Sequence, residues 1–273
     1  MSAHSKNDLA VSLLQHTPTP CDISAGIARL EKAAAAAASQ GSQLLITPEC
    51  GMTGYNMDVE EAQSSAFKAR SAVAQQIDDI AKRHAIAILY GFIEQYQDIR
   101  YNSVCLTSDE GQSLLHYRKT HLWGELDKRL FSAGDSLAPV IDYKGWRLSA
   151  LICYDVEFPE TVRSLALAGA QLVMVPTALM APFRFVAEKM VPVRAAENQI
   201  FLAYANLVGK EGNIVYEGCS TVAGPDGHVL VAASSEHDEL LHTVLRAESI
   251  SKNRQEIPYH KDRRPELYAA VTR

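Results

Sequence analysis

Short hydrophobic runs alternate along the chain with longer segments in which hydrophobic residues recur every three or four positions. The clearest of these segments carries Ile23, Ile27, Leu30, Ala34 and Ala37, whose spacing places them on one face of a helix. Asp22 is a suitable N-terminal cap for that helix. The first part of the chain is therefore expected to form strands at 9–15, 43–47 and 86–93, with helices at 23–39 and 64–84.

The two halves of the chain share a pattern, in which strands alternate with helices and a run of strands follows, without a residue-level repeat. A hairpin of strands is expected at 101–107 and 113–117, followed by strands at 140–143 and 146–153, a helix at 159–168, a strand at 172–175, a helix at 183–198, and strands at 201–207, 221–223, 229–233 and 241–245. Strands that alternate with helices favour βαβ units, and hairpins favour additional antiparallel strands. The pattern predicts mixed sheets covered by helices, with a charged, irregular arm from about residue 248.

Composition and charge narrow the classes of function. The 273 residues are 47% hydrophobic and 21% charged, which is typical of a globular protein and excludes intrinsic disorder. The net charge of −6, without a basic cluster, makes nucleic acid and anionic membranes unexpected partners. No stretch approaches the roughly 18 apolar residues of a membrane helix. The start, Met1–Asp8, lacks the apolar run of a secretory signal, so a cytoplasmic protein is expected.

The five cysteines form no Cys-x-x-Cys pair, so neither a structural zinc site nor a disulfide framework is expected. Cys153 is the candidate for chemistry, because an apolar strand leads directly into it and Pro159 suits the first turn of a following helix. Groups at the carboxyl end of a strand in an α/β fold can meet a ligand. A thiol there can act as a nucleophile, although most free cysteines are simply small buried hydrophobic residues.

Two further segments place a charged residue after an apolar strand. Leu44–Ile46 leads into Thr47-Pro48-Glu49, where a carboxylate whose pKa is raised by burial could serve as a general base. Lys119, within Tyr117-Arg118-Lys119-Thr120-His121, could stabilise an oxyanion or a thiolate. Taken alone, each residue is more simply explained as a charge in solvent.

Together, the three segments resemble the nitrilase superfamily of carbon–nitrogen hydrolases. That family uses a glutamate, a lysine and a cysteine in this chain order, and the matching positions are Glu49, Lys119 and Cys153. Further matches are Ser132-Ala133-Gly134-Asp135, Arg194-Ala195-Ala196-Glu197-Asn198 and the closing segment Asp262–Tyr268. The resemblance extends from Leu9 to Tyr268 and so covers almost the whole chain.

The resemblance implies an α/β fold, specifically a four-layer αββα sandwich with two mixed β-sheets. It implies that residues 1–273 form a single carbon–nitrogen hydrolase domain, with an arm at about 248–273 that packs at a subunit interface. A homodimer or higher homo-oligomer without cofactor or metal is therefore expected. The implied mechanism has Glu49 take the thiol proton and Cys153 attack the substrate carbon, while Lys119 and the Tyr154 N–H hold the oxyanion.

Many members of the family carry a second glutamate eight residues beyond the lysine. Asp127 stands at that position here, within flanking residues that stay in register with the family's segment. Glu125 lies two residues earlier and is the alternative if the loop shifts. Asp127 is favoured, although an aspartate is one methylene shorter than the family's glutamate.

The branch of the family is indicated by the residues after the nucleophile. Cys153-Tyr154-Asp155 is typical of amidase-like members, whereas nitrilases usually carry Cys-Trp-Glu, so a small amide is the expected substrate and a nitrile the alternative. The pocket is expected to draw on Tyr55, Trp123, Tyr154 and Phe158, with Thr177 and Ala178 from a later loop. On the simpler interpretation, two of the four aromatic residues belong to the core.

Three other classes of function compete with this hypothesis. A papain-like Cys–His site has nine histidines available, but none lies in a recognisable partner motif. A nucleotide-binding domain lacks both the Gly-x-Gly-x-x-Gly turn and a P-loop. The presence of all three triad residues argues against a non-catalytic binding protein on the same fold. The aspartate at position 127, where the family has glutamate, leaves that hypothesis open.

Overall fold

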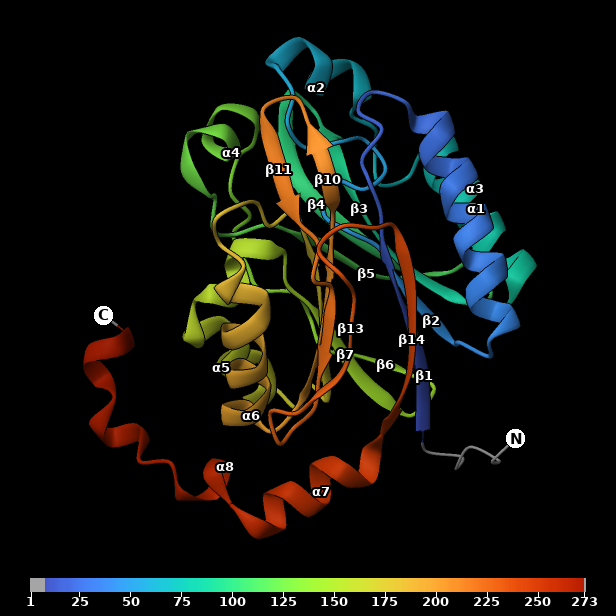
Figure 1. Ribbon diagram of the computed structural model, residues 1–273. Coiled ribbons are helices and arrows are strands. Elements are labelled where there is room, and N and C mark those ends of the chain that lie inside the picture. Colours follow the sequence, from blue (N-terminus) through green and yellow to red (C-terminus); the bar gives the residue numbers. More distant parts are fainter. Residues whose placement is uncertain (1–7, 273) are drawn as a thin grey trace.

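Two six-stranded mixed β-sheets form the centre of the computed structural model, which describes residues 8–272 (Figure 1). The first sheet has the strand order β14-β1-β2-β3-β4-β5, and the second has the order β13-β12-β9-β8-β7-β6. Each contains three neighbouring parallel strands, flanked by antiparallel strands. The similar order of elements in the two halves of the sequence thus corresponds to the same strand pattern in both sheets.

The strands of the first sheet are β1 (Asp8–Gln15), β2 (Leu44–Ile46), β3 (Ala87–Tyr96), β4 (Ile99–Thr107), β5 (Ser113–Arg118) and β14 (Glu239–Arg246). Those of the second are β6 (Ile141–Tyr143), β7 (Trp146–Ala150), β8 (Leu172–Thr177), β9 (Phe201–Asn206), β12 (Thr221–Ala223) and β13 (Val229–Ala232). A separate hairpin consists of β10 (Val208–Glu211) and β11 (Ile214–Glu217).

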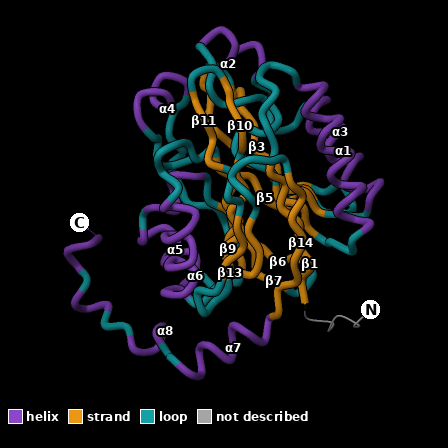
Figure 2. The backbone as a smooth tube through the Cα atoms, viewed as in Figure 1, coloured by secondary structure: helices purple, strands orange, loops and turns teal. Residues whose placement is uncertain are grey.

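Helices cover the outer face of each sheet, which makes four layers (Figure 2). Helices α1 (Ile23–Ser39) and α3 (Ala72–His84) lie on the first sheet, and α5 (Pro159–Leu167) and α6 (Val191–Asn198) lie on the second. Strand β2 illustrates the layering, because Leu44 and Ile46 pack between the sheets while Leu45 packs under the helices. The predicted αββα sandwich with two mixed sheets is confirmed.

The helix expected at 64–84 is instead two helices, α2 (Val59–Ser65) and α3. Phe67 lies between them, where its backbone pairs with Glu94 of β3 and its ring stacks on Phe92 at 4.5 Å between centroids. This long-range contact interrupts a segment whose local pattern favours one continuous helix.

Three other elements differ from the sequence-based expectation. Helix α4 (Gly124–Leu130) and the β10–β11 hairpin were not expected, and the strand expected at 146–153 ends at Ala150. A 3-10 helix, η1 (Cys153–Glu157), follows that strand. The late helix begins as a π-helical turn, Val186–Met190, that continues into α6.

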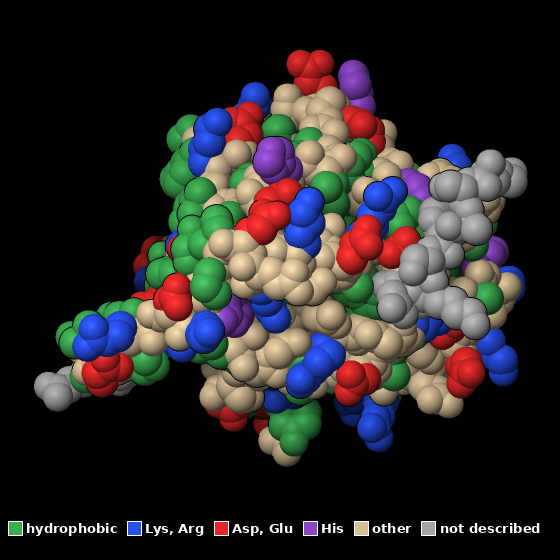
Figure 3. All heavy atoms as spheres, turned by 90° about the horizontal axis from the view of Figure 1, so that it is seen from below, with side chains coloured by type: hydrophobic (Ala, Val, Ile, Leu, Met, Phe, Trp, Pro, Cys, Tyr) green, Lys and Arg blue, Asp and Glu red, His purple; other side chains and the backbone are tan. Residues whose placement is uncertain are grey.

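The arm from residue 248 is not irregular as predicted, because it begins with α7 (Ala247–Glu256) and α8 (Tyr259–Asp262) and continues through 3-10 turns at Pro265–Leu267 and Ala269–Thr272. Ile250 anchors α7 in the core with 4% exposure. Asn198 and Gln199, at the end of α6, also hold the arm, through hydrogen bonds with Asn253, Ile257 and His260. The last part of the arm projects from the molecule when seen from below (Figure 3).

Within residues 8–272, no helix is long and apolar enough to cross a membrane. Residues 1–7, on which the expectation of no secretory signal depends, lie outside the described part of the chain.

Candidate active site

The carboxyl ends of β2, β5 and β7 bring the three expected triad residues together between the sheets. Glu49 follows β2, Lys119 follows β5 and Cys153 follows β7. Lys119 and Glu49 are joined by an ion pair, and the charges of both act on the Cys153 thiol. Residues far apart in the sequence therefore form one cluster.

Close backbone packing fixes Glu49. Cys50 adopts a left-handed conformation (φ 48°) that turns the chain immediately after Glu49. On the neighbouring strand, a Cβ at Gly91 would lie only 2.6 Å from the Pro48 carbonyl oxygen and 2.8 Å from the Cys50 nitrogen. Only glycine at position 91 allows β3 to approach this loop so closely.

The Glu49 carboxylate has one occupied and one unoccupied oxygen. Its Oε1 accepts hydrogen bonds from Lys119 Nζ at 2.7 Å and from Asn102 Nδ2 at 2.6 Å. Its Oε2 is buried without a hydrogen-bond partner among the described residues. Burial raises the pKa of Glu49, against the charge of Lys119, and the charge of Asp127 raises it further. Oε2 is thus an available acceptor on a carboxyl group that takes up a proton more readily than usual.

Lys119 is held between two carboxylates in the interior. Its Nζ donates to Glu49 Oε1 and to Asp127 Oδ2, each at 2.7 Å, and its side chain is fully buried. Burial acts to lower the pKa of Lys119, but the two carboxylates outweigh it and hold that pKa well above its ordinary value. Lys119 is therefore a fixed cation with one N–H bond left for another acceptor.

Of the two candidates for the second acid, Asp127 lies beside Lys119 and Glu125 does not. Asp127 on α4 is fully buried, and its carboxylate also accepts hydrogen bonds from the Tyr55 hydroxyl at 2.7 Å and the Trp123 N–H at 2.9 Å. Glu125 faces solvent with its side chain 94% exposed and pairs with Lys128. The alternative of Glu125 is corrected: the two acids are two residues apart on α4 and so point to opposite sides of the helix, one into the interior and one into solvent.

Replacing Asp127 by asparagine is expected to lower kcat/KM by about 10- to 100-fold, because a charged hydrogen bond to Lys119 contributes about 1.5–3 kcal/mol. Glu125→Gln on the same helix is the matched control and should stay within about twofold of wild type. Ammonia release from a small amide measures both variants. Equal activities for the two variants would contradict this assignment of the second acid.

Cys153 occupies a strained turn at the start of η1. It has a φ of 46°, a left-handed conformation that residues other than glycine rarely adopt, and it remains partly accessible to solvent. The Thr177 side chain and the Ala178 backbone form hydrogen bonds with the thiol that favour its charged form. Burial and the charge of Glu49 outweigh them and raise the pKa of Cys153. The thiol thus needs a base, and Glu49, whose charge acts on it, is the candidate.

Asp155 joins the lysine segment to the cysteine segment. Its buried carboxylate accepts hydrogen bonds from the Tyr117 hydroxyl (2.8 Å), the Thr120 hydroxyl (3.0 Å), the His121 N–H (2.9 Å) and the Ile152 N–H (3.0 Å), and it pairs with His121 Nδ1 (2.9 Å). These contacts hold the segment that carries Lys119 against the segment that carries Cys153. At the other end of η1, Arg194 on α6 donates to the carbonyl oxygens of Val156 and Glu157.

The expected pocket residues divide into two groups. Tyr55 is 2% exposed and belongs to the core, where its hydroxyl serves Asp127. The half-buried rings are in contact with other rings: Trp123 with Phe183 at 6.0 Å, and Phe158 with Tyr154 at 5.0 Å and with His121 at 4.1 Å. Thr177 and Ala178 lie at the thiol, as described above. Aromatic surface therefore flanks Cys153.

Two supporting residues were missed by the sequence analysis. The side chain of Asn102 in β4 donates to the Glu49 carboxylate. The backbone carbonyl oxygen of Asn102 accepts a hydrogen bond from the backbone N–H of Lys119 at 2.8 Å. Glu211 in β10 accepts the backbone N–H groups of Tyr55 (3.1 Å) and Asn56 (2.9 Å). A polar residue within an otherwise apolar strand was the available signal for Asn102. Glu211 carried no such signal, because the hairpin that presents it was not expected.

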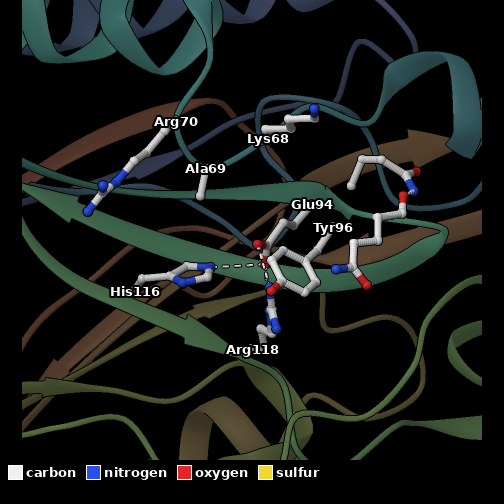
Figure 4. Close-up of a pocket in the computed structure, with 9 residues that line it drawn as sticks. Lys68, Ala69, Arg70, Glu94, Tyr96, His116 and Arg118 are labelled. Atoms are coloured by element: carbon white, nitrogen blue, oxygen red, sulfur yellow. Dashed lines mark hydrogen bonds and ion pairs between the residues drawn. The ribbon is translucent and has the colours of Figure 1, made fainter.

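A cavity of about 500 Å³ that contains none of the three triad residues lies over β3 and β5. It is lined by Lys68, Ala69, Arg70, Glu94, Gln95, Tyr96, Gln97, His116 and Arg118 (Figure 4). Glu94 is engaged there by hydrogen bonds from Ser103, His116 and Arg118. Burial alone would raise the pKa of Glu94, but the hydrogen bonds from Arg118 and His116 outweigh it and lower the pKa to about 2. This cluster holds β3, β4 and β5 together and offers no free acid.

Comparison with known proteins identifies the family. A sequence model of the carbon–nitrogen hydrolase family matches residues 10–255. The "hydrolase in pqqF 5′ region" of Pseudomonas protegens is 43% identical, covering 98% of this chain and 93% of that protein. The (R)-stereoselective amidase of a Pseudomonas species is 34% identical, covering 94% and 92%. The chain belongs to the carbon–nitrogen hydrolase family, as the resemblance implied.

Solved structures agree with this membership. A variant of the Nesterenkonia AN1 amidase, from the nitrilase superfamily, matches with a TM-score of 0.85 at 34% identity and covers 99% of this chain and 100% of that one. Another variant of that amidase, at TM-score 0.84 and 35% identity over 98% of both chains, carries the acetamide moiety of fluoroacetamide on its active-site cysteine. The protein is therefore an enzyme of the nitrilase superfamily and resembles its amidases.

Among residues 8–272, no group of three or more His, Cys, Asp or Glu side chains could hold a metal ion.

Proposed function

We propose that this enzyme hydrolyses the C–N bond of small amides through a thioester on Cys153. The observation that carries the proposal is the unpartnered, buried Oε2 of Glu49, which is paired with Lys119 and whose charge acts on the thiol of Cys153, a partly exposed residue. A buried acceptor without a partner costs free energy. It is accounted for if a thiol, an amine or a water molecule donates to it during the reaction.

In the first half of the reaction, Glu49 Oε2 removes the thiol proton and the sulfur attacks the amide carbonyl carbon. The carbonyl π electrons move to oxygen, and this oxyanion is stabilised by the third N–H of Lys119 and by the N–H of Tyr154 in the first turn of η1. The C–N bond then breaks, and the nitrogen leaves as ammonia or an amine with the proton held by Glu49. Thr177 and Ala178 hold the sulfur in place.

In the second half, water replaces the departed amine. Glu49 takes a proton from this water molecule while the oxygen of the water attacks the thioester carbon. The C–S bond breaks, the carboxylic acid is released, and the proton on Glu49 returns to the sulfur. Asp127 acts as a positioning residue, since its carboxylate is already used by Lys119, Tyr55 and Trp123.

Ammonia release from matched amides and nitriles tests this proposal. Propanamide, butanamide and benzamide are expected to be hydrolysed with kcat/KM at least about tenfold above that of the nitriles of the same carbon skeleton. Faster release of ammonia from the nitriles would favour the alternative, a nitrilase. Absence of turnover across both series would contradict hydrolysis of small amides and nitriles altogether.

The same assay across pH tests the base. Glu49 must be ionised to accept the thiol proton, so activity falls as the pH drops through its pKa. Burial raises this pKa above the ordinary value of 4.5, and the acid limb of kcat/KM is expected above that value. Replacing Glu49 by glutamine should remove turnover together with this acid limb.

We also propose that residues 1–273 act as one carbon–nitrogen hydrolase domain and that the enzyme is a homodimer or higher homo-oligomer. A hydrophobic cluster continuous across both sheets supports a single domain. Exposed apolar residues support association, namely Val193 on α6 with 53% exposure and, on the arm, Leu267 with 64% and Val271 with 59%. A second subunit at this face would cover the arm that projects in Figure 3.

A cytoplasmic location is proposed as well. It is supported by the five cysteines, all of which are described and unpaired, including Cys21, which is exposed. Free thiols persist in a reducing compartment.

A further inference from the structure

Glu157, the last residue of η1, has a carboxylate that the proposed mechanism does not use. The side chain is half-buried, and nothing in the described part of the chain forms a hydrogen bond or an ion pair with its carboxylate. The guanidinium of Arg194 binds the Glu157 backbone oxygen at 2.8 Å, but its other nitrogens are directed to the Val156 carbonyl at 3.2 Å and to Glu197 at 3.0 Å. Arg194 is therefore engaged elsewhere and does not pair with this carboxylate.

Three observations place Glu157 on the substrate side of η1. Side chains three residues apart eclipse one another in a 3-10 helix, so Glu157 shares a face with Tyr154, the residue next to the nucleophile. Lys119, enclosed in the site, is one of two cations whose charges act on Glu157. The charge of Glu157 also acts on Tyr204, whose hydroxyl accepts a hydrogen bond from Thr177 beside the thiol.

The surroundings of Glu157 suit a cation that carries some apolar surface. Tyr154 in η1 and Phe158, the residue that follows η1, contact each other edge to face. Trp123, whose backbone N–H binds Asp127, pairs with the ring of Phe183. Aromatic faces attract cations, and a half-buried carboxylate without a partner is stabilised when a ligand brings one. Burial raises the pKa of Glu157, which fits a group that lacks a fixed counter-ion. The nearest cations of the protein are committed, Lys119 to Glu49 and Asp127, and Arg194 to Glu197.

We propose that Glu157 is a specificity-determining residue that pairs with a protonated amine on the substrate, so that the enzyme prefers small amides bearing an ammonium group over neutral amides of the same shape. This inference rests on the proposed amide hydrolysis and adds the class of substrate to it. The neutral amide group is presented to Cys153, and the ammonium group of the same molecule lies against Glu157 and the aromatic rings.

The test compares pairs of amides in which a methyl group replaces the ammonium group. The cationic members are glycinamide, 3-aminopropanamide, 4-aminobutanamide and 5-aminopentanamide, and their neutral counterparts are propanamide, butanamide, pentanamide and hexanamide. For at least one chain length, wild type is expected to show kcat/KM about tenfold or more higher for the cationic member. In Glu157→Gln this ratio should fall by about tenfold or more. Because each ratio is measured on one enzyme, a general loss of activity cancels.

Glu160→Gln is the matched control, since Glu160 is an exposed carboxylate three residues further along, on α5, and its loss should leave the ratio unchanged. The wild-type enzyme alone can overturn the inference: hydrolysis of neutral amides without preference for an ammonium group at any length contradicts it and leaves the proposed function standing. Retention of the preference in Glu157→Gln also contradicts it. If no amide in the panel is hydrolysed, that result would instead contradict the proposed function.

Discussion

Replacing Cys153 by alanine is expected to lower amide hydrolysis by at least about 10⁴-fold, because the reaction loses the atom that becomes acylated. The folded state should be little affected. Cys153 is a partly exposed residue and the substitution removes only one sulfur atom, so the free energy of unfolding is expected to stay within about 1 kcal/mol of wild type. Ammonia release measures the first effect and urea denaturation measures the second.

Cys219→Ala is the matched control for this variant. Cys219 is also partly accessible and also has a left-handed backbone (φ 54°), yet it lies outside the cluster of Glu49 and Lys119. Its replacement should leave turnover within about twofold of wild type. Appreciable activity in Cys153→Ala, or an equal loss in Cys219→Ala, would show that the nucleophile has been assigned to the wrong thiol.

Replacing Lys119 by methionine is expected to have the second-largest effect, on both activity and stability. Turnover should become undetectable or nearly so, since the oxyanion loses its cation. Glu49 and Asp127 would be left in the interior without their common partner, which typically costs about 3–5 kcal/mol of folding free energy. Urea denaturation at several pH values, together with ammonia release, measures these effects.

The pH dependence identifies the cause of that loss. Burial already raises the pKa of Glu49, and in the variant the opposing charge of Lys119 is lost, so the folded protein binds this proton more tightly than the unfolded chain does. The stability deficit of Lys119→Met should therefore be smallest at low pH and should grow as the pH rises towards 8. Lys128→Met, at an exposed pair with Glu125, is the control and should change stability by less than about 0.5 kcal/mol. A deficit independent of pH would contradict the electrostatic explanation.

The sequence predicted the strands that precede Glu49, Lys119 and Cys153, because each is a short run with a clear apolar pattern. The end of the third strand was misplaced, since β7 stops at Ala150 and Cys153 opens η1. The register of the flanking residues favoured Asp127 over Glu125, but the hydrophobic pattern could not choose between them, since that choice depends on the orientation of α4, a helix of seven residues. A helix this short has too few turns for a reliable hydrophobic period. Which acid is buried is decided by its contacts with Lys119 and Tyr55, which are distant in the sequence.

Long-range contacts also explain the other differences. Phe67 leaves a helical pattern because its ring stacks on Phe92 in the first sheet, and no local signal reports that contact. Asn102 in β4 binds Glu49, which follows β2, and the number of residues between them does not indicate that their side chains meet. No local pattern distinguishes Glu157 from other acidic residues, because what sets it apart is that its carboxylate has no partner among the described residues. Sequence patterns report local periodicity, whereas these residues act through pairings set by the topology.

The central claim, that Cys153 forms a thioester with the acyl part of an amide, is tested most directly by mass spectrometry of enzyme quenched in acid during turnover of propanamide. The predicted result is a mass increase equal to one propionyl group, located by peptide mapping on the peptide containing Cys153 and absent from Cys153→Ala. Ammonia release without acylation of Cys153 at any time point, or acylation of another cysteine, would contradict the account.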